Sequence, residues 1–361
     1  MFPRNAWYVA AMSRELAAGE VLSRMICEVP MALFRAGDGV AAALVDQCPH
    51  RLYPLSEGAV QGNTLRCAYH GLAFAADGRC SSIPSQNEIP ANACVKAFPV
   101  REAHGLIWLW PGDPVEAFKT PLPMFETGPG YLAGLDLSFL DPSETWGVAG
   151  PHRIAVDANF MLAVDNLLDL THVAFVHAAT FDNAGILGSE RISKPVGRNQ
   201  LIDFFRFKNP MSPPLRAAYM LDPAVPMYDS FLETYWQSPS VMVLVHGATP
   251  EGGDRETEGT IVAGINCITP ATRTSCHYFW SQSVYRNLHG GAVRDAWEIA
   301  TRAAFAEDEA ILRTQQANLE RFGTQDLQDD VALMLKADKA IVMARRIAAR
   351  MVREETQGNT R

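Results

Sequence analysis

Two short cysteine–histidine pairs constrain this chain more than any other feature. The stretch "CPHRLYPLSEGAVQGNTLRCAYH", residues 48–70, places Cys48-x-His50 and Cys67-x2-His70 on either side of a 16-residue spacer. Thiolates and imidazoles at such short spacing are typical metal ligands, and four of them complete one site. Any fold of this chain must therefore bring two loops together around a metal centre.

The composition of the two pairs distinguishes between metals. Structural zinc usually takes pairs of one kind, Cys with Cys or His with His, whereas each pair here combines one of each. Two thiolates on one iron and two imidazoles on the other hold a Rieske [2Fe-2S] cluster. Pro49 stiffens one loop, and Gly71 lets the other turn back beside the metal. The predicted cluster ligands are Cys48, His50, Cys67 and His70. Structural zinc is the alternative.

The organisation of the chain changes near residue 117. From residue 20 to about 110, short apolar runs such as "VLSRMI", "VAAALV" and "LIWLW" are separated by turn signals, which predicts a small all-β domain. The proline-rich "WPGDPVEAFKTPLPMF" ends that pattern. We therefore expect a first domain over residues 1–117 that carries the cluster.

Residues 118–350 predict a second, α+β domain. Residues 157–177 and 293–319 have helical periodicity, whereas 239–247, 259–269 and 275–285 alternate as strands do. The stretch "DDVALMLKADKAIVMARRIAARMVREE", residues 329–355, has apolar residues at helical spacing and predicts a surface helix, and a polar tail is expected over 351–361. The expected fold class is α+β, with an all-β domain first.

Charge and cysteine content restrict the partners. Forty acidic against 31 basic residues give a net charge of -9, the wrong sign for binding nucleic acid. No run approaches the ~18 apolar residues of a membrane helix, and the first residues lack the order of a signal peptide. Seven cysteines, an odd number, argue against a disulfide framework. We expect a cytoplasmic protein that binds neither nucleic acid nor membrane.

A second group of metal-ligand residues lies in "VDNLLDLTHVAFVH". Asn166, Asp169 and His172 are three apart, so they form one stripe on a helix. His177 would point roughly 140° away from His172, so the helix must end or bulge before it. Two histidines and one carboxylate with open positions beside them are the ligands of non-haem iron(II) oxygenases.

The third ligand must come from elsewhere in the chain. In "AAFAEDEAILRTQQANL", Asp308 shares a helical face with Ile311, Leu312 and Gln315, which predicts an inward-facing carboxylate. Its neighbours Glu307 and Glu309 leave open which carboxylate binds the metal.

The order of these segments resembles one enzyme family. From "PRNAWYVA" through the two pairs, "LIWLWPGDP", "VDNLLDLTH" and "FAEDEAIL", nearly the whole chain is similar to Rieske non-haem iron aromatic-ring-hydroxylating oxygenases. Within them it most resembles the oxygenase components of vanillate and dicamba O-demethylases. The resemblance implies a helix-grip catalytic domain, an antiparallel sheet with helices, and a homotrimer. It also implies that His172, His177 and Asp308 bind a mononuclear iron(II).

The resemblance implies roles for three further residues. Asp169 would bridge His172 to His70 of the partner subunit, a head-to-tail path for one electron. Asn166 would line the iron site, and Tyr69 would hydrogen-bond a cluster cysteine.

The implied activity is that of a terminal monooxygenase component in aromatic catabolism. It would take NADH-derived electrons through a separate reductase or a ferredoxin and use O2 to demethylate a methoxylated, vanillate-like aromatic acid, releasing formaldehyde. Ring hydroxylation, N-demethylation and methyl hydroxylation of an arylsulfonate are alternatives on the same scaffold. An electron carrier or redox sensor without enzyme activity is the alternative of another class.

The predicted substrate pocket rests on strand patterns. Alternation in "VMVLVHGATP" places Leu244 and His246 on one face. Leu244 and Asn266 fall where the dicamba enzyme has an asparagine and a histidine that contact the substrate's carboxylate, so dicamba itself is not the expected substrate. Trp280 is the expected aromatic wall.

Overall fold

The computed structural model describes residues 2–129, 132, 136–286, 291–323 and 332–358. The chain divides into one unit of Met1–Leu122 with Thr269–Arg273, and a second of Pro123–Ile268 with Thr274–Arg361. The expected boundary at residue 117 falls inside helix α1 (Pro114–Lys119), so the first unit extends to Leu122. It also includes the end of a strand from far along the chain, which local sequence patterns do not reveal.

The first unit is built from three antiparallel sheets, as expected of an all-β domain. One has the order β1 (Tyr8–Met12), β11 (Leu106–Leu109), β10 (Val100–Ala103). Another has the order β2 (Val21–Ile26), β3 (Val29–Arg35), β4 (Ala41–Val45), β9 (Ala97–Phe98). The last has the order β5 (Ala59–Gln61), β6 (Thr64–Arg66), β7 (Ala73–Ala75), β8 (Cys80–Ser82). Two short 3-10 turns, η1 (Ser13–Glu15) and η2 (Leu55–Glu57), connect strands.

Apolar side chains fill the space between the second and third of these sheets. Phe34, Leu44 and Phe74 are fully buried in one cluster that also contains Cys48 and Cys67. Burying each large apolar side chain contributes roughly 1.5–3 kcal/mol, so this cluster holds the two cysteine loops on a rigid base.

The second unit contains a seven-stranded sheet. Its order is β12 (Trp146–Val156), β18 (Ser275–Tyr285), β17 (Thr260–Thr272), β16 (Val241–Pro250), β15 (Tyr228–Gln237), β14 (Gln200–Asn209), β13 (Glu190–Val196). The pairings from β13 to β17 and between β12 and β18 are antiparallel. The three strands expected at 239–247, 259–269 and 275–285 correspond to β16, β17 and β18.

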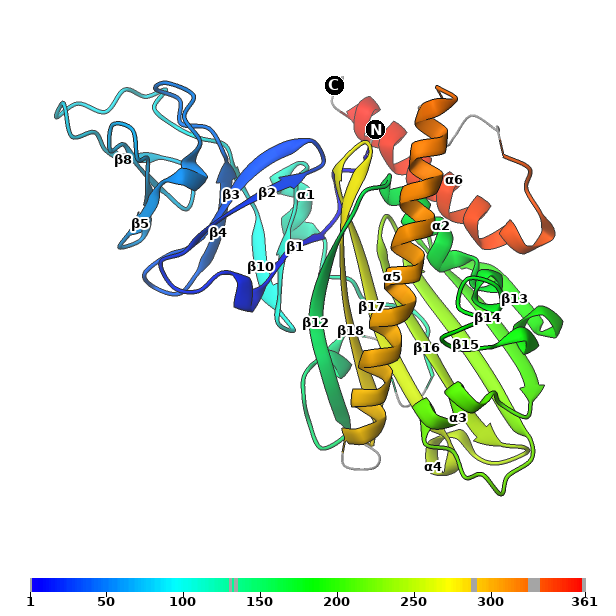
Figure 1. Ribbon diagram of the computed structural model, residues 1–361. Helices are drawn as coiled ribbons and strands as arrows, with labels where there is room; N and C mark the ends of the chain where they lie inside the picture. The colour runs from blue at the N-terminus through cyan, green and yellow to red at the C-terminus, as the bar shows by residue number, and fades with distance from the viewer. Residues whose placement is uncertain (1, 130–131, 133–135, 287–290, 324–331, 359–361) are drawn as a thin grey trace. The chain divides into compact units, whose positions relative to one another are not determined.

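Helices cover this sheet, which confirms the expected sheet-plus-helix domain. They are α2 (Phe160–Leu168), α3 (Pro213–Tyr219), α4 (Arg255–Glu258), α5 (Ala292–Arg321) and α6 (Lys339–Gly358), with 3-10 turns η4 (Ser138–Leu140), η5 (Leu170–Ala174), η6 (Ala184–Gly188) and η8 (Lys336–Asp338). The long helix α5 crosses the sheet over β12 and β18, and α6 packs beside α2 and β13–β14 (Figure 1).

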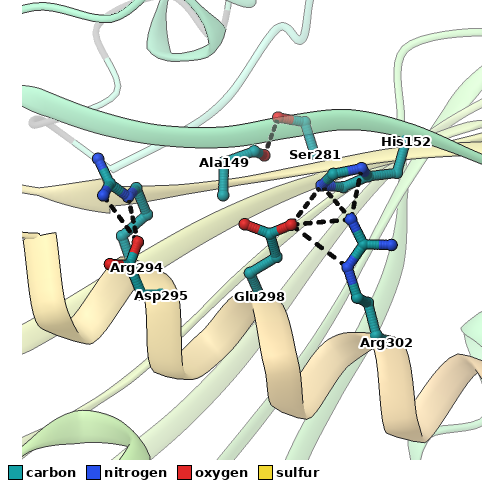
Figure 2. Close-up of polar contacts among 7 residues, drawn as sticks. All are labelled: Ala149, His152, Ser281, Arg294, Asp295, Glu298 and Arg302. Carbon is teal, nitrogen blue, oxygen red and sulfur yellow. Dashed lines mark hydrogen bonds and ion pairs between the residues drawn. The ribbon is translucent and has the colours of Figure 1, made fainter.

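Polar contacts hold α5 on the outer strand β12. His152 Nε2 lies 3.0 Å from Glu298 Oε1, and the Arg302 guanidinium donates to the same oxygen at 2.8 Å (Figure 2). Ser281 Oγ donates to the Ala149 carbonyl at 2.7 Å and ties β18 to β12. These contacts fix the part of α5 that precedes the predicted metal ligand.

The structure corrects the predicted helix over 157–177. Helix α2 begins where Asn159 accepts from the Met161 amide, and it ends at Leu168. Asp169 then accepts hydrogen bonds from the Thr171 amide and hydroxyl at 3.2 and 2.5 Å and starts η5. Because a short carboxylate competes for backbone amides, the α-helix ends here. The predicted single stripe of Asn166, Asp169 and His172 is therefore wrong, although the expected break before His177 does occur.

The C-terminal helix α6 covers Lys339–Gly358, whereas the sequence predicts a helix over 329–355; residues 332–338 are not α-helical, and 329–331 lie outside the described residues. Helix α6 runs to Gly358, so residues 351–358 of the predicted polar tail are helical, while 359–361 lie outside the described residues. Its buried residues recur every three to four positions, at Ala340, Ile341, Ala344, Ile347 and Ala348. Over the described ranges, no helix has the length and apolar character needed to span a bilayer.

Candidate metal centres and substrate cavity

The two cysteine loops have matching backbone geometry. The Cys48 amide donates to the Tyr53 carbonyl and the Leu52 amide donates back to Cys48, at 2.8 and 2.9 Å. In the other loop the Cys67 amide donates to Leu72 at 2.8 Å, and Gly71 donates back to Cys67 at 3.0 Å. Leu52 and Gly71 both have a positive φ, of 58° and 77°, so each loop turns sharply behind its histidine.

This geometry brings the four predicted cluster ligands together. The Cys48 and Cys67 side chains are 2% exposed, whereas His50 and His70 are exposed, with ring centroids 4.4 Å apart. Burial raises the pKa of the Cys48 thiol, and a bound metal is what would keep it a thiolate. Two buried sulfurs beneath two solvent-facing imidazoles suit a cluster with Cys on one iron and His on the other.

Tyr69 does not contact a cysteine in the described geometry. Its side chain is 60% exposed, and its ring lies 4.0 Å from the His70 ring and 5.7 Å from the Tyr53 ring. Tyr69 therefore packs against His70, whereas the resemblance implied a hydrogen bond to a cluster cysteine.

A second group of ligand atoms lies in the other unit. His172, His177 and Asp308 each offer one atom, and these atoms lie within 4.8 Å of one another. Asp308 Oδ1 is 3.4 Å from His172 Nε2 and 3.3 Å from His177 Nε2. Burial would raise the pKa of Asp308, but the two imidazoles lower it well below its ordinary range. An ionised carboxylate between two imidazoles is a donor set that fits a divalent iron.

The other nitrogen of each histidine is held by a neighbouring group. His172 Nδ1 contacts the Asp169 carbonyl oxygen, and His177 Nδ1 lies 2.7 Å from Glu307 Oε2. Thr180 Oγ1 donates to the other Glu307 oxygen at 2.8 Å. These contacts point both Nε2 atoms toward Asp308. Metal-binding histidines are commonly oriented in this way, by a carbonyl or carboxylate that holds the nitrogen away from the metal.

The three neighbouring acidic residues of α5, Glu307, Asp308 and Glu309, point in different directions. Glu307 holds the outer nitrogen of His177, and Glu309 pairs with Arg313 at 3.0 Å on the outside of the helix. Asp308 belongs to the buried stripe of α5, which consists of Val293, Trp297, Thr301, Ala304, Asp308, Leu312 and Gln316. The prediction that Asp308 faces inward is confirmed. The predicted companions Ile311, 48% exposed, and Gln315 instead face outward, because the stripe advances mostly by four residues.

Asp169 lies at the edge of this group. Its backbone carbonyl, not its carboxylate, contacts His172, and its Oδ1 accepts from Thr171. Asn166 Nδ2 donates to Asp308 Oδ1 at 3.1 Å. Both predicted catalytic residues therefore touch a ligand residue, Asn166 through its side chain and Asp169 through its backbone carbonyl.

A cavity of about 100 Å³ opens beside the three ligand residues. Most of its lining is apolar, with Leu167, Leu170, Phe207, Phe231 and Leu232 among the lining side chains. The predicted pocket residues Leu244, His246 and Asn266 line it, as does Trp297.

The predicted wall residue Trp280 is not among the described lining residues. It packs outside, with its ring 4.4 Å from His152 and 5.4 Å from Phe305.

Hydrogen bonds orient the polar residues of the cavity. Tyr219 Oη lies 2.7 Å from His246 Nδ1, and Tyr278 Oη donates to Asn266 Oδ1 at 2.8 Å. Burial lowers the pKa of His246 to about 3, so its imidazole is neutral at physiological pH. Asn266 therefore lines the cavity with its carbonyl oxygen held by Tyr278.

Sequence patterns missed Glu307, Tyr219 and Gln282 as site residues. Glu307 was visible only as an alternative ligand, and Tyr219 lies on a short helix with no motif. Gln282 continues the alternation of "SCHYFWSQSVY", and this signal would have placed it on the same face as Tyr278 and Trp280. Local twist and helix packing decide which of those three reaches the cavity.

Comparison with known proteins supports the same division of the chain. Residues 6–99 match the family described as Rieske [2Fe-2S] domain, and residues 156–354 match Vanillate O-demethylase oxygenase C-terminal domain. The dicamba O-demethylase oxygenase component of Stenotrophomonas maltophilia is 37% identical over 287 residues, 78% of each chain. The chloroacetanilide N-alkylformylase oxygenase component of Rhizorhabdus wittichii (strain DC-6 / KACC 16600) is 34% identical, over 98% of this chain and 97% of that one.

A solved structure agrees with the fold over the full length. The crystal structure of dicamba monooxygenase bound to 3,6-dichlorosalicylic acid matches with a TM-score of 0.84 at 32% identity, covering 100% of this chain and 99% of that one. The enzyme therefore carries a Rieske [2Fe-2S] cluster and a mononuclear non-haem iron, and both donor sets described above fit these groups. By sequence and by structure, this chain belongs to the Rieske oxygenase family whose C-terminal domain is that of vanillate O-demethylase, as the terminal oxygenase component of a monooxygenase.

Proposed function

We propose that this oxygenase removes the methyl group of a methoxylated aromatic compound and releases formaldehyde. The observation that carries the proposal is the position of the cavity, which is lined by His172, His177 and Asp308 at one place and largely by apolar side chains elsewhere. An aromatic ring suits the apolar part, and one substituent then lies beside the metal ligands. The similarity to a dicamba O-demethylase component adds support.

We propose the four residues of the cysteine–histidine pairs as cluster ligands and His172, His177 and Asp308 as iron ligands. When bound, the two metal groups supply single electrons and the activation of O2. Asp308 stays ionised because two imidazoles face it. Asn166 and Glu307 keep Asp308 and His177 in position, at 3.1 and 2.7 Å.

The net reaction balances with one substrate, O2, two electrons and two protons. One oxygen atom enters the methyl carbon to give a hemiacetal, and the other leaves as water. The hemiacetal then breaks the bond between its former methyl carbon and the oxygen on the ring, and its hydroxyl proton moves to that oxygen, giving a phenol and formaldehyde. The chain's own task is to hold the methyl group beside the ligand residues and to exclude water, which the apolar lining of Leu170, Phe207 and Leu232 favours.

Electron supply requires a partner, which we propose to be an NADH-dependent reductase or a ferredoxin in the cytoplasm. Asp169 is the proposed bridge between His172 and His70 of the partner subunit in a head-to-tail trimer. Its position between α2 and η5, with its backbone against His172, supports this role. No disulfide joins any of the seven cysteines, all of which lie in the described ranges, as expected in a reducing compartment.

Removal of an N-linked carbon group is the second candidate. The similarity to a chloroacetanilide N-alkylformylase component, which is 34% identical, extends over 98% of this chain. The sequence also left open a vanillate-like acid as substrate, ring hydroxylation, and methyl hydroxylation of an arylsulfonate. These reactions use the same metal sites and differ in their products and in the pocket that they require.

Product analysis tests the proposal. The holoenzyme, supplied with NADH and a surrogate reductase, is offered methoxybenzoates, methoxyphenols and N-methoxymethyl anilides, with the corresponding compounds that lack the ether as controls. Formaldehyde formed in step with phenol and NADH consumption supports O-demethylation. NADH consumption without formaldehyde from any aryl methyl ether, in protein with full iron content, rejects it.

A further inference from the structure

The C-terminal helix α6 holds α2 through a partly buried ion pair. The Arg345 guanidinium on α6 contacts the Asp165 carboxylate on α2 with two nitrogens: Nε lies 3.2 and 3.1 Å from the two oxygens, and Nη2 contacts Oδ2. The two side chains are only 19% and 13% exposed. Because a guanidinium that binds a carboxylate with two nitrogens fixes direction as well as distance, the pair sets the position of α2 on α6.

The pair lies next to the contact that restrains the proposed iron ligand Asp308. Consecutive residues of an α-helix point about 100° apart. Asp165 therefore reaches α6, while its neighbour Asn166 donates to Asp308 Oδ1 on α5 at 3.1 Å. Helix α2 packs against both of these helices. A shift of α2 away from α6 would move the Asn166 amide relative to the carboxylate that it holds.

The same turn of α2 also positions the proposed iron ligand His172. The Asp169 amide donates to the Asp165 carbonyl at 3.0 Å, and the Asp169 carbonyl oxygen contacts His172 Nδ1. Asp165 is therefore connected to two iron ligands, to His172 through Asp169 and to Asp308 through Asn166. Each connection contains one intervening residue.

Helix α2 depends on such contacts because it is short. Its nine residues fall below the ~12–15 that an isolated helix requires in water, so tertiary contacts must stabilise it. A second contact acts at its end, where Arg191 Nη2 donates to the Leu168 carbonyl at 3.3 Å. The same guanidinium donates through Nη1 to the Ala337 carbonyl, just before α6. The C-terminal segment is thus tied to the last turn of α2 at two places.

The charge of Asp165 is retained at a cost. Burial raises the pKa of Asp165 to about 6, and the Arg345 guanidinium opposes that rise. Two apolar side chains would pack α6 on α2 without taking charges out of water, but they would not fix the rotation of α2. The pair is therefore better explained by positioning than by stability.

We propose that Arg345 and Asp165 are positioning residues for the mononuclear iron, and that docking of the C-terminal helix is coupled to occupancy of the iron site. Iron binding holds His172 and Asp308 in place, which favours the docked arrangement of α2 and α6, and docking favours iron binding in return. Linkage requires the two effects to be equal in size. The inference rests on the proposed ligand set and is independent of the proposed demethylation.

Iron affinity tests one direction of this coupling. In holoenzyme with an intact cluster, Arg345→Gln and Asp165→Asn should each weaken binding of the mononuclear iron about tenfold, measured by dialysis against a graded chelator followed by iron analysis. The double variant should lose no more affinity than either single variant, because both changes remove the same contact. Arg346→Gln is the matched control, since Arg346 is the next residue of α6 and is exposed. It should bind iron as the wild type does.

Hydrogen exchange tests the other direction. Mass spectrometry compares the wild type before and after removal of the mononuclear iron alone, with the cluster absorbance checked in both samples. The backbone amides of α6 over residues 340–350 should exchange about tenfold faster without iron, whereas those of β2–β4 should not change. In the double variant, the α6 amides should exchange at the same rate with and without iron.

Wild-type iron affinity in a folded Arg345→Gln protein overturns the inference. So does α6 exchange that does not respond to iron in the wild type. If Arg345→Gln does not fold, Arg345→Lys replaces it, because lysine keeps the positive charge and cannot bind the carboxylate with two nitrogens. Full iron retention by His172→Ala would reject the ligand set and the inference with it. Intact coupling without formaldehyde would support the inference and reject the proposed demethylation alone.

Discussion

Asn166 on α2 and Asp308 on α5 are joined by a hydrogen bond of 3.1 Å between side chains 142 positions apart in the sequence. The accepting oxygen, Asp308 Oδ1, is also the atom nearest both histidine Nε2 atoms. The bond therefore restrains the carboxylate oxygen that lies beside both histidines. Because α2 and α5 pack together, the same contact links the two segments that supply the site.

Loss of this bond should weaken metal binding. Asn166→Ala is expected to lower the affinity for the mononuclear iron about 10- to 100-fold, the range seen when a residue that orients a metal ligand is removed. Dialysis against a graded chelator followed by iron analysis measures the change. Asn87→Ala, at an exposed position in the first unit, is the control. Equal iron retention in the two variants would contradict a positioning role for Asn166.

Adjacent glutamates on α5 should behave differently. Glu307→Gln weakens the contact that holds His177 Nδ1, so we expect about tenfold weaker iron binding. Glu309→Gln removes only an ion pair with Arg313 on the outer face and should retain wild-type affinity. The cluster absorbance should be the same in both. If Glu307→Gln and Glu309→Gln lose iron to the same extent, the loss does not come from the contact between Glu307 and His177.

Iron counting separates the two metal sites. The wild type is expected to hold about three irons per chain, two in the cluster and one mononuclear. His172→Ala should reduce this to about two with an unchanged cluster spectrum. Cys48→Ser should remove the cluster and leave about one. A His172→Ala protein with a full complement of iron would place the mononuclear ion elsewhere.

Acid should destabilise the fold through His246. Its folded pKa of about 3 lies below the ordinary value of 6.5, so the unfolded chain binds the extra proton between these two values. Stability is then lost as pH falls below 6.5, by up to about 1.4 kcal/mol per pH unit from this group. Denaturant unfolding at pH 7.0 and 5.5 should show a smaller loss in His246→Gln than in the wild type. Identical losses would mean that folding does not lower the pKa of His246.

Sequence alone identified the parts of this protein whose chemistry depends on short spacing. The pairs at residues 48–70 specify a cluster because mixed cysteine–histidine ligands at two hairpin tips suit few other metals. The strands β16, β17 and β18 were predictable because side chains alternate along them, and α5 because its apolar residues recur at helical spacing. Asp308 was predicted to face inward for the same reason.

Tertiary structure decided what these patterns leave open. Asp308 rather than Glu307 meets the Nε2 atoms of both histidines because α5 lies across the sheet at one particular rotation. Helix α2 ends at Leu168 because the Asp169 carboxylate bonds Thr171 and starts a new turn. Trp280 and Gln282 alternate onto the same face of β18, yet only Gln282 reaches the cavity, since α5 covers Trp280 and Gly264 opens space for Gln282. Spacing along the chain determines which groups can act together, whereas the packing of helix on sheet determines which of them meet.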